Sequence, residues 1–283
     1  MNSQKRHFYK IIITLWFIIG SDYSSVFAQD YDSLSVIIKK MQRGENDSIR
    51  RKANEEFTLR FLDSLNYPHS FESEFSDFKN VSIQTSEDKT LRFYTWMFPH
   101  YNGDKYEYFG FIQIRKAKSD TFDIIQLKDS TQQILKPESE KLSPERWLGS
   151  VYYSLNQVNY SGKTYYVLLG WKGFNQLLTK KIIDVFYIDK TKMKFGFPLF
   201  KTGSVYRNRM VFSFTSQATM SLRFEKNGKE IVFDHLSTPK GKVDTDLSII
   251  AGPDGSYDLF KLKRGRYFLD RDIDARTESS EPR

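Results

Sequence analysis

The chain of 283 residues contains no cysteine, which limits what the protein can be. Without thiols it forms no disulfide bonds, has no thiol nucleophile and offers no cysteine ligand to a metal. Side-chain packing alone must therefore stabilise the fold. The 24 Phe, 17 Tyr and 4 Trp residues supply large buried areas for that purpose.

Motifs of the common enzyme classes are also absent. The chain has no Gly-Xaa-Ser-Xaa-Gly nucleophile elbow, no His-Glu-Xaa-Xaa-His helix, no Walker loop and no Gly-Xaa-Gly-Xaa-Xaa-Gly turn. These absences argue against many hydrolases and nucleotide-binding proteins, and we expect no cofactor. Hydrolysis by paired carboxylates stays open, because its two residues can lie far apart in the sequence.

The apolar run near the N-terminus, Ile11–Ile19, is too short to cross a bilayer. It is interrupted by Thr14 and falls short of the roughly 20 apolar residues that a span requires. Basic residues precede it, and Val26-Phe27-Ala28 follows it with the pattern that a signal peptidase reads. We interpret residues 1–28 as a cleavable secretory signal peptide. Asp22 argues against the alternatives, a buried helix or an uncleaved anchor.

Removal of this segment leaves a mature chain of 255 residues that begins at Gln29. The formal charge falls from +8 to +6, because 40 basic residues then face 34 acidic ones. We interpret this mild excess as a source of solubility, with weak attraction to anionic envelope surfaces. The expected location is periplasmic or extracellular, so nucleic acid is not an expected partner. The mature chain is not expected to span a membrane.

Two short helices are predicted over about residues 31–66. The first ends at Gly44, and the second begins with Asp47 as its N-cap and ends at Asn66. Apolar residues recur at helical spacing in both: Leu34, Ile37, Ile38 and Met41 in the first, and Ile49, Ala53, Phe57, Phe61 and Leu65 in the second. Such helices need a further element against which to bury these stripes.

From Val81 onward the apolar pattern has a period of two, which is typical of strands. We predict twelve strands, at 81–85, 91–98, 105–115, 121–127, 150–158, 164–170, 181–188, 209–216, 220–225, 230–236, 256–262 and 266–270. Their short connections favour an antiparallel meander. The segment 129–147 could be a mobile loop, a short helix or a boundary between two halves of the sheet, and 277–283 form a polar tail.

Asn227-Gly228 is the strongest hairpin signal in the chain. A two-residue turn there sets Glu225 opposite Glu230, a like-charged pair that Arg223 and the flanking lysines can screen. The same register predicts one apolar face, formed by Met220, Leu222, Phe224, Ile231 and Phe233.

His235 is the histidine with the most acidic surroundings. Asp234 precedes it, and Asp244 and Asp246 lie a short loop away, which suggests a general base or a partial metal site. The hairpin register, however, sends the side chains of Asp234 and His235 to opposite faces. We therefore predict that these two residues form no dyad and that His235 lies at the edge of the core.

A second acidic pattern resembles a calcium loop in its spacing. Asp270, Asp272 and Asp274 alternate, and Glu281 occupies the twelfth position of an EF-hand. The sixth position is Ala275, where the sharp turn of an EF-hand requires glycine. We interpret the pattern as a charged strand end, with calcium as the alternative. No metal site is therefore predicted.

Aromatic residues are the remaining candidates for ligand binding. The predicted strand 91–98 carries aromatic side chains on both faces, including Trp96, and Tyr101 follows in the next turn. Such a strand either is buried between two layers or exposes a stacking platform for a sugar, and burial is the commoner case. Trp171 lies between Gly170 and Gly173, which permit a ligand to approach closely. Trp171, Trp96 and Tyr101 are the candidate site residues.

The segments Gly170-Trp171, Phe233–Leu236, Gly252–Asp258 and Asp272–Arg276 resemble those of a group of uncharacterised exported bacterial proteins. The resemblance covers roughly residues 80–276. It implies export and a single strand-rich domain, and it implies no catalytic residue.

Together these patterns predict an α+β protein that is predominantly antiparallel β. A signal peptide (1–28) precedes a single domain (29–276), in which an N-terminal helical pair packs on a long meander that forms a sandwich or a strongly curved sheet. The favoured function is that of a non-catalytic envelope or extracellular binding protein, whose partner is a glycan or an envelope protein. The alternatives are a secreted glycan or ester hydrolase with dispersed carboxylates, and a structural or assembly partner in the cell envelope.

Overall fold

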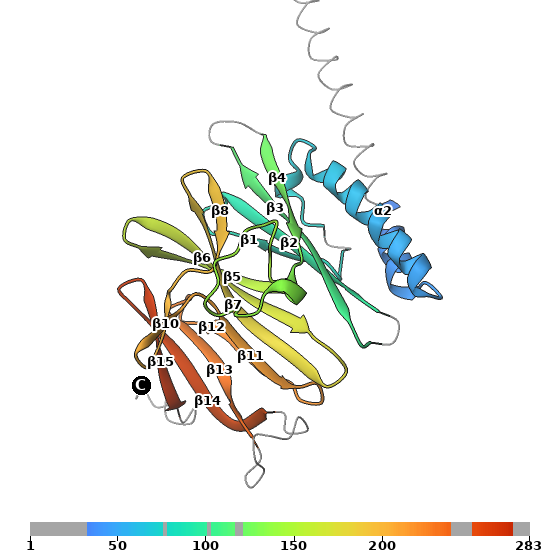
Figure 1. The fold of residues 1–283 in the computed structure, drawn as a ribbon. Helices are drawn as coiled ribbons and strands as arrows, with labels where there is room; N and C mark the ends of the chain where they lie inside the picture. Colours follow the sequence, from blue (N-terminus) through green and yellow to red (C-terminus); the bar gives the residue numbers. More distant parts are fainter. Residues whose placement is uncertain (1–32, 76–77, 101–102, 117–120, 239–250, 274–283) are drawn as a thin grey trace, which may run out of the picture. The chain divides into compact units, whose positions relative to one another are not determined.

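The computed structural model describes residues 33–75, 78–100, 103–116, 121–238 and 251–273 (Figure 1). The chain divides into two compact units, with the boundary between Phe78 and Lys79. The first unit is helical and the second is built from antiparallel sheets, so the predicted α+β class is confirmed. The single domain over 29–276 stays a prediction, and the signal peptide lies outside the described residues.

The first unit contains the two predicted helices. These are residues 33–43 and α2 (Asp47–Leu65), and a 3₁₀ turn, η1 (Ser70–Glu72), follows. The predicted N-cap of α2 is wrong by one residue: the side chain of Asn46 accepts a hydrogen bond from the backbone N–H of Ile49 at 3.0 Å. Asp47 instead lies in the first turn, where its charge favours the helix dipole. The helix ends at Asn66, as predicted.

The second unit contains three sheets (Figure 1). The first has the order β1 (Ser82–Thr85), β2 (Leu91–Pro99), β3 (Tyr106–Arg115), β4 (Phe122–Lys128). The second, which we call the middle sheet, has the order β11 (Met210–Thr215), β7 (Leu178–Asp189), β6 (Lys163–Gly173), β5 (Val151–Tyr160), with β8 (Lys192–Phe195) paired to β7. The third has the order β10 (Val205–Arg207), β9 (Phe200–Thr202), β15 (Arg266–Ile273), β14 (Gly252–Lys263), β13 (Glu230–Ser237), β12 (Leu222–Glu225).

All twelve predicted strands are present, and three short ones, β8, β9 and β10, were not predicted. These strands have only three or four residues each, too few to show an alternating pattern. One strand pair is parallel: β15 lies beside β9, so the fold is not a pure meander.

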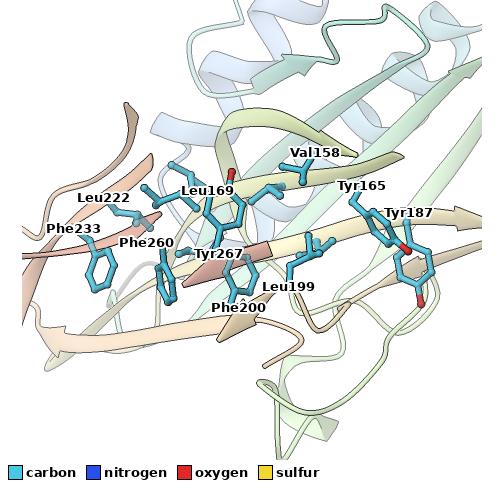
Figure 2. Close-up of a cluster of buried hydrophobic side chains, with 14 of the residues drawn as sticks. Val158, Tyr165, Leu169, Tyr187, Leu199, Phe200, Leu222, Phe233, Phe260 and Tyr267 are labelled. Atoms are coloured by element: carbon cyan, nitrogen blue, oxygen red, sulfur yellow. The ribbon is translucent and has the colours of Figure 1, made fainter. Parts of the chain in front are cut away.

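The middle sheet is buried on both faces, which decides between the two predicted architectures in favour of a sandwich. On β6, Tyr166 and Leu168 pack into a cluster with Phe93 and Ile112 of the first sheet. Val167, which points the opposite way, joins a second cluster that includes the third sheet. Figure 2 shows members of this second cluster: Val158, Tyr165 and Leu169 of the middle sheet together with Phe233, Phe260 and Tyr267 of the third.

The segment 129–147 connects β4, the last strand of the first sheet in the sequence, to β5 of the middle sheet, so of the three predicted alternatives a boundary between two parts of the β structure is the one that fits. It begins with a single 3₁₀ turn, η2 (Thr131–Gln133), and its Leu142 exchanges two backbone hydrogen bonds with Phe195 of β8. Trp147 is completely buried, and its indole N–H donates to the Tyr152 hydroxyl at 2.8 Å. The segment therefore packs into the core beside the middle sheet.

A buried ion pair of the middle sheet is linked to this segment by a hydrogen bond from Arg209 to Pro137. Asp184 of β7 and Arg209 are both 0% exposed, and Arg209 Nη2 lies 2.8 Å from Asp184 Oδ1. Nη2 is poorly aligned for a hydrogen bond and Nε has no acceptor among the described residues, so the contact is mainly one of charge. Arg209 Nη1 donates to the Pro137 carbonyl at 2.5 Å, and the Tyr152 hydroxyl donates to Asp184 Oδ2 at 3.1 Å.

We expect Asp184→Asn to lower the free energy of unfolding by about 3–5 kcal/mol, because it leaves the Arg209 guanidinium buried without a counter-charge. Urea denaturation measures the change. The double variant Asp184→Leu/Arg209→Met removes both charges and should recover most of this loss. A double variant as unstable as Asp184→Asn would contradict the explanation.

The predicted hairpin register is confirmed. Glu225 faces Glu230, and both are held as expected, with Arg223 Nη2 2.6 Å from Glu225 and Lys226 Nζ 3.1 Å from Glu230. The turn differs from the two-residue type, since residues 226, 227 and 228 all have positive φ. Gly228 is required there because its φ is +77° and a Cβ would collide with the Asn156 side chain.

We expect Gly228→Ala to lower the free energy of unfolding by at least about 2 kcal/mol, through backbone strain and collision with Asn156 together. Gly162→Ala is the matched control, because Gly162 has a similar φ of +74° but nothing within 4 Å of its Cβ position. It should lose only about 1 kcal/mol. Equal losses in urea denaturation would show that the collision contributes nothing.

Candidate functional site

The candidate site is a pocket of about 720 Å³ at the end of β4. Pairing between β3 and β4 begins at Phe109 and Lys128, so Tyr106, Glu107 and Tyr108 extend beyond the partner strand. The chain continues from β4 into η2. The pocket is the space between this turn and the residues of β3 that pair with β2 but not with β4. We call it the β3–η2 pocket. The residues that line it are Lys105, Tyr106, Glu107, Tyr108, Phe109, Gln126, Leu127, Lys128, Asp129, Ser130, Thr131, Gln132, Gln133 and Glu145.

Asp129 fixes the wall of the β3–η2 pocket by joining three chain segments. Its carboxylate accepts backbone N–H hydrogen bonds from Tyr108 at 3.3 Å, Thr131 at 3.0 Å and Gly149 at 3.2 Å. It also accepts a hydrogen bond from the Thr131 hydroxyl. A Cβ at Gly149 would lie 2.5 Å from Asp129 Cγ, so only glycine permits this approach.

Behind this wall lies Lys172 of β6, which is 2% exposed. Its ammonium group donates to the Thr131 hydroxyl at 2.8 Å and to the Gly149 carbonyl at 2.5 Å, and it lies 4.2 Å from the centroid of the Tyr108 ring. Burial lowers the pKa of Lys172 to about 8, and the nearby charge of Asp129 opposes this shift. All three donors of Lys172 are thus directed at partners within the fold.

Tyr106 provides the aromatic surface of the pocket, and Trp171 supports it from behind. The two rings meet edge to face, with centroids 5.8 Å apart and an interplanar angle of 84°. A Cβ at Gly173 would lie 2.7 Å from Trp171 and 2.8 Å from Tyr106, so this glycine makes room for both rings. The predicted residue Trp171 is therefore next to the pocket, as the support of Tyr106 rather than as a lining residue.

The other two predicted aromatic residues do not join this site. Trp96 is 0% exposed and stacks on Phe109 at 5.8 Å, so it offers no surface to a ligand and its candidate role is wrong. Burial, the commoner case for strand 91–98, holds on both faces, since Phe93 and Tyr94 are also 0% exposed. Tyr101 lies outside the described residues.

The calcium alternative has little support among the described residues. β15 continues through Ile273, so Asp270 lies in an extended strand rather than in a loop, and its carboxylate pairs with Lys261 at 3.0 Å. Asp274, Glu281 and the side chain of Asp272 lie outside the described residues. Within the described part of the chain, no group of three or more His, Asp or Glu side chains could hold a metal ion.

His235 pairs with a carboxylate, but with one that sequence reasoning missed. Asp234 turns away and accepts the backbone N–H of Ser221 at 2.8 Å, which confirms that the two neighbours form no dyad. His235 Nδ1 instead lies 3.0 Å from Oδ2 of Asp258 on β14. A bulge between Asp234 and Leu236 shifts the register at this point, and no local sequence pattern predicts such a shift.

Sequence reasoning also missed Tyr106, Asp129 and Lys172. Lys172 lies two residues beyond the predicted strand 164–170, and the one usable signal was the apolar run that leads to it, since β6 continues to Gly173. A lysine is almost never fully buried unless its ammonium group has partners, so such a position deserves a search for acceptors.

The acids around the pocket have structural partners. Glu107 Oε1 lies 2.7 Å from His100 Nε2, and Asp129 accepts the four hydrogen bonds described above. A hydrogen bond from the Ser143 hydroxyl lowers the pKa of Glu145. A general acid needs a raised pKa, which is the opposite of the shift at Glu145.

Comparisons with protein-family models, curated proteins and solved structures find no match for this chain. The resemblance to exported bacterial proteins therefore stays a prediction. Among the described residues, no helix is long and apolar enough to cross a membrane.

The buried ammonium group predicts how stability depends on pH. The pKa of Lys172 is about 8 in the folded chain and about 10.4 in the unfolded chain, so the unfolded chain binds more protons between these values. The free energy of unfolding should therefore rise from pH 8 to pH 10, by up to about 2 kcal/mol. Above pH 10 the raised pKa of buried Tyr108 acts in the opposite direction.

Urea denaturation across this pH range tests the assignment. Lys172→Met should remove most of the rise, whatever its effect on stability at pH 7, because it removes the most deeply buried of the lysines whose pKa is lowered. Burial also lowers the pKa of Lys180 and Lys181, which leaves a smaller rise. The exposed Lys136 provides the control, and Lys136→Met should keep the full rise. A rise of unchanged size in Lys172→Met would assign the effect to another group.

Proposed function

We propose that this chain is an exported, non-catalytic binding protein that holds an uncharged saccharide in the β3–η2 pocket. The observation that carries the proposal is a pocket of about 720 Å³ whose lining includes one supported aromatic ring, Tyr106, and the amide residues Gln132 and Gln133 of η2. Pockets of this size accommodate small molecules.

The lining matches the chemistry of a sugar ring. A pyranose presents apolar C–H faces and a rim of hydroxyl groups, each of which both donates and accepts hydrogen bonds. Tyr106 offers an apolar face, and the amides of Gln132 and Gln133 donate and accept in the same way as the hydroxyl groups.

The charges of the lining favour a neutral ligand. Two positive and two negative side chains belong to the lining and surround the same pocket: Lys105, Lys128, Glu107 and Glu145. The charge of Asp129 is balanced by the buried ammonium group of Lys172, with which it interacts electrostatically. A strongly charged ligand would meet a like charge on one side of the pocket.

The two alternative functions receive less support. A carboxylate hydrolase needs one acid held in its protonated form, whereas the acids here are engaged as acceptors. An assembly partner is favoured by a large exposed apolar patch. The exposed side chains Leu135, Leu177 and Val205 belong to three different segments and so do not argue for such a patch.

Export itself rests on residues 1–28, and a periplasmic or extracellular location would give the protein access to saccharides of the envelope.

Isothermal titration of the purified chain, residues 29–283, with neutral oligosaccharides of glucose, mannose, xylose and N-acetylglucosamine tests the proposal. We expect saturable binding to one of them. Tyr106→Ala should weaken it at least tenfold, because the ring supplies the apolar contact.

Tyr257→Ala is the matched control, since Tyr257 is a partly exposed tyrosine on β14, and it should bind as the unmodified chain does. Absence of saturable binding to every oligosaccharide would overturn the saccharide proposal. Equal affinity of Tyr106→Ala and the unmodified chain would overturn the assignment of the pocket.

A further inference from the structure

A second feature of the surface lies at the start of β15, on other strands than those that form the β3–η2 pocket. Arg266 follows the turn between β14 and β15, and its guanidinium carbon lies 4.5 Å from the ring centroids of both Tyr160 and Tyr206. Tyr160 ends β5 and Tyr206 belongs to β10, so three strands hold the guanidinium between two rings. We call this arrangement the Arg266 clamp.

The turn before Arg266 fixes its position. Gly265 has φ +78°, and a Cβ there would lie 2.5 Å from the Asn159 carbonyl oxygen and 3.0 Å from Tyr160. Only glycine lets this turn approach the end of β5 so closely. The side chain of Arg266 therefore contacts two rings, and the turn that precedes it packs against the end of β5.

The clamp holds its positive charge without a carboxylate. No Asp or Glu of the described residues lies within ion-pair distance of Arg266, and Arg266 Nε is buried without a hydrogen-bond partner there. Asp189 lies at the same end of the middle sheet, but Lys163 at 3.2 Å and Lys194 at 2.9 Å engage it. Near the other end of β15, Asp270 pairs with Lys261.

A second cation and an exposed ring adjoin the clamp. Lys201 Nζ lies 5.8 Å from the centroid of Tyr206 and 5.6 Å from that of Phe268, again with no carboxylate partner among the described residues. Tyr206 is 40% exposed and its neighbour Val205 is 53% exposed. The surface thus combines two cations without acid partners and an accessible aromatic side chain.

We propose that the Arg266 clamp binds an anionic saccharide, with the guanidinium of Arg266 and the ammonium of Lys201 receiving its carboxylate or phosphate group. A guanidinium presents paired N–H donors that match the oxygens of such a group, and because Nε is buried the pair here is on Nη1 and Nη2. The contacts with the rings of Tyr160 and Tyr206 position the guanidinium before the ligand arrives. Tyr206 supplies the contact for the sugar ring.

The size of the site favours a sugar over a membrane surface. One guanidinium, one ammonium and one exposed ring match a single sugar residue with one anionic group. Recognition of an anionic membrane uses clusters of four to eight basic residues. Lys263 and Arg264 at the same turn bring the basic residues here to four, but a membrane surface does not require the exposed ring of Tyr206, which a sugar does. The proposal does not rest on the β3–η2 pocket, because the two sites share no residue.

Isothermal titration with oligomers of galacturonic acid, against galactose oligomers of the same length, tests the proposal. We expect the purified chain, residues 29–283, to bind the acidic oligomer at least tenfold more tightly than the neutral one at 0.05 M salt. The preference should shrink at 0.5 M salt, because added ions screen the contact.

Three variants locate the binding. Arg266→Gln should weaken acidic-oligomer binding at least tenfold, and Arg266→Lys, which keeps the charge but loses the fork, should weaken it severalfold. Lys201→Gln should also weaken it, and this variant keeps the clamp intact should Arg266→Gln fail to fold. Lys136→Gln removes one charge elsewhere and should have no effect.

The outcome separates this proposal from that for the β3–η2 pocket. Tyr106→Ala should bind the acidic oligomer normally, even if no neutral oligosaccharide binds the chain. Equal affinity for acidic and neutral oligomers would overturn the proposal, as would normal binding by both Arg266→Gln and Lys201→Gln. Tighter binding to vesicles with a quarter anionic phospholipid than to the acidic oligomer would assign the surface to membranes instead.

Discussion

The central residues of the middle sheet are buried on both faces, and the rest of the second unit depends on this constraint. Each side chain in the buried part of β6 and β7 must either be apolar or bring its own polar partner into the core. Asp184 is the sharpest case, because a carboxylate on such a strand requires a cation. Arg209 supplies it, and the same guanidinium donates to the carbonyl of Pro137. One charge placed in a buried strand thus determines where the connection after β4 must pass.

The same constraint shapes both proposed binding sites. Lys172 lies on the buried strand β6, and its ammonium group donates hydrogen bonds to the Thr131 hydroxyl and the Gly149 carbonyl behind the β3–η2 pocket. Tyr160, the last residue of β5, lies at the other end of the middle sheet from Lys172 and forms one side of the Arg266 clamp. Residues of the middle sheet therefore support each site from the core side. The groups proposed to contact the ligand come from the first and third sheets. Preorganised groups of this kind lose little entropy when a ligand binds.

Local patterns predicted the elements of this fold because helices and strands obey short periods. The alternation from Met220 to Phe233 predicted the register of the β12–β13 hairpin correctly. The short strand β9 was missed, and with it the parallel pairing to β15 that brings Tyr206 near Arg266. Asp258 was missed as the partner of His235 because a bulge sets their contact. Trp96 and Trp171 were both candidates from sequence, with Trp171 favoured by its neighbouring glycines, and only tertiary packing shows that Trp96 is buried and that Trp171 lies beside a pocket.

Three cations show why the proposed anion site lies where it does. Arg209 is buried and its charge is matched by Asp184. Lys172 is buried too, and its donors point at a hydroxyl, a carbonyl and a ring, so neither group has capacity left for a ligand. Arg266 is stacked between two rings, which satisfy the faces of the guanidinium but leave its edge unused. Stacking fixes a cation without neutralising it, whereas an ion pair does both. Of these three groups, Arg266 therefore retains the field and the donors that an anionic sugar would need.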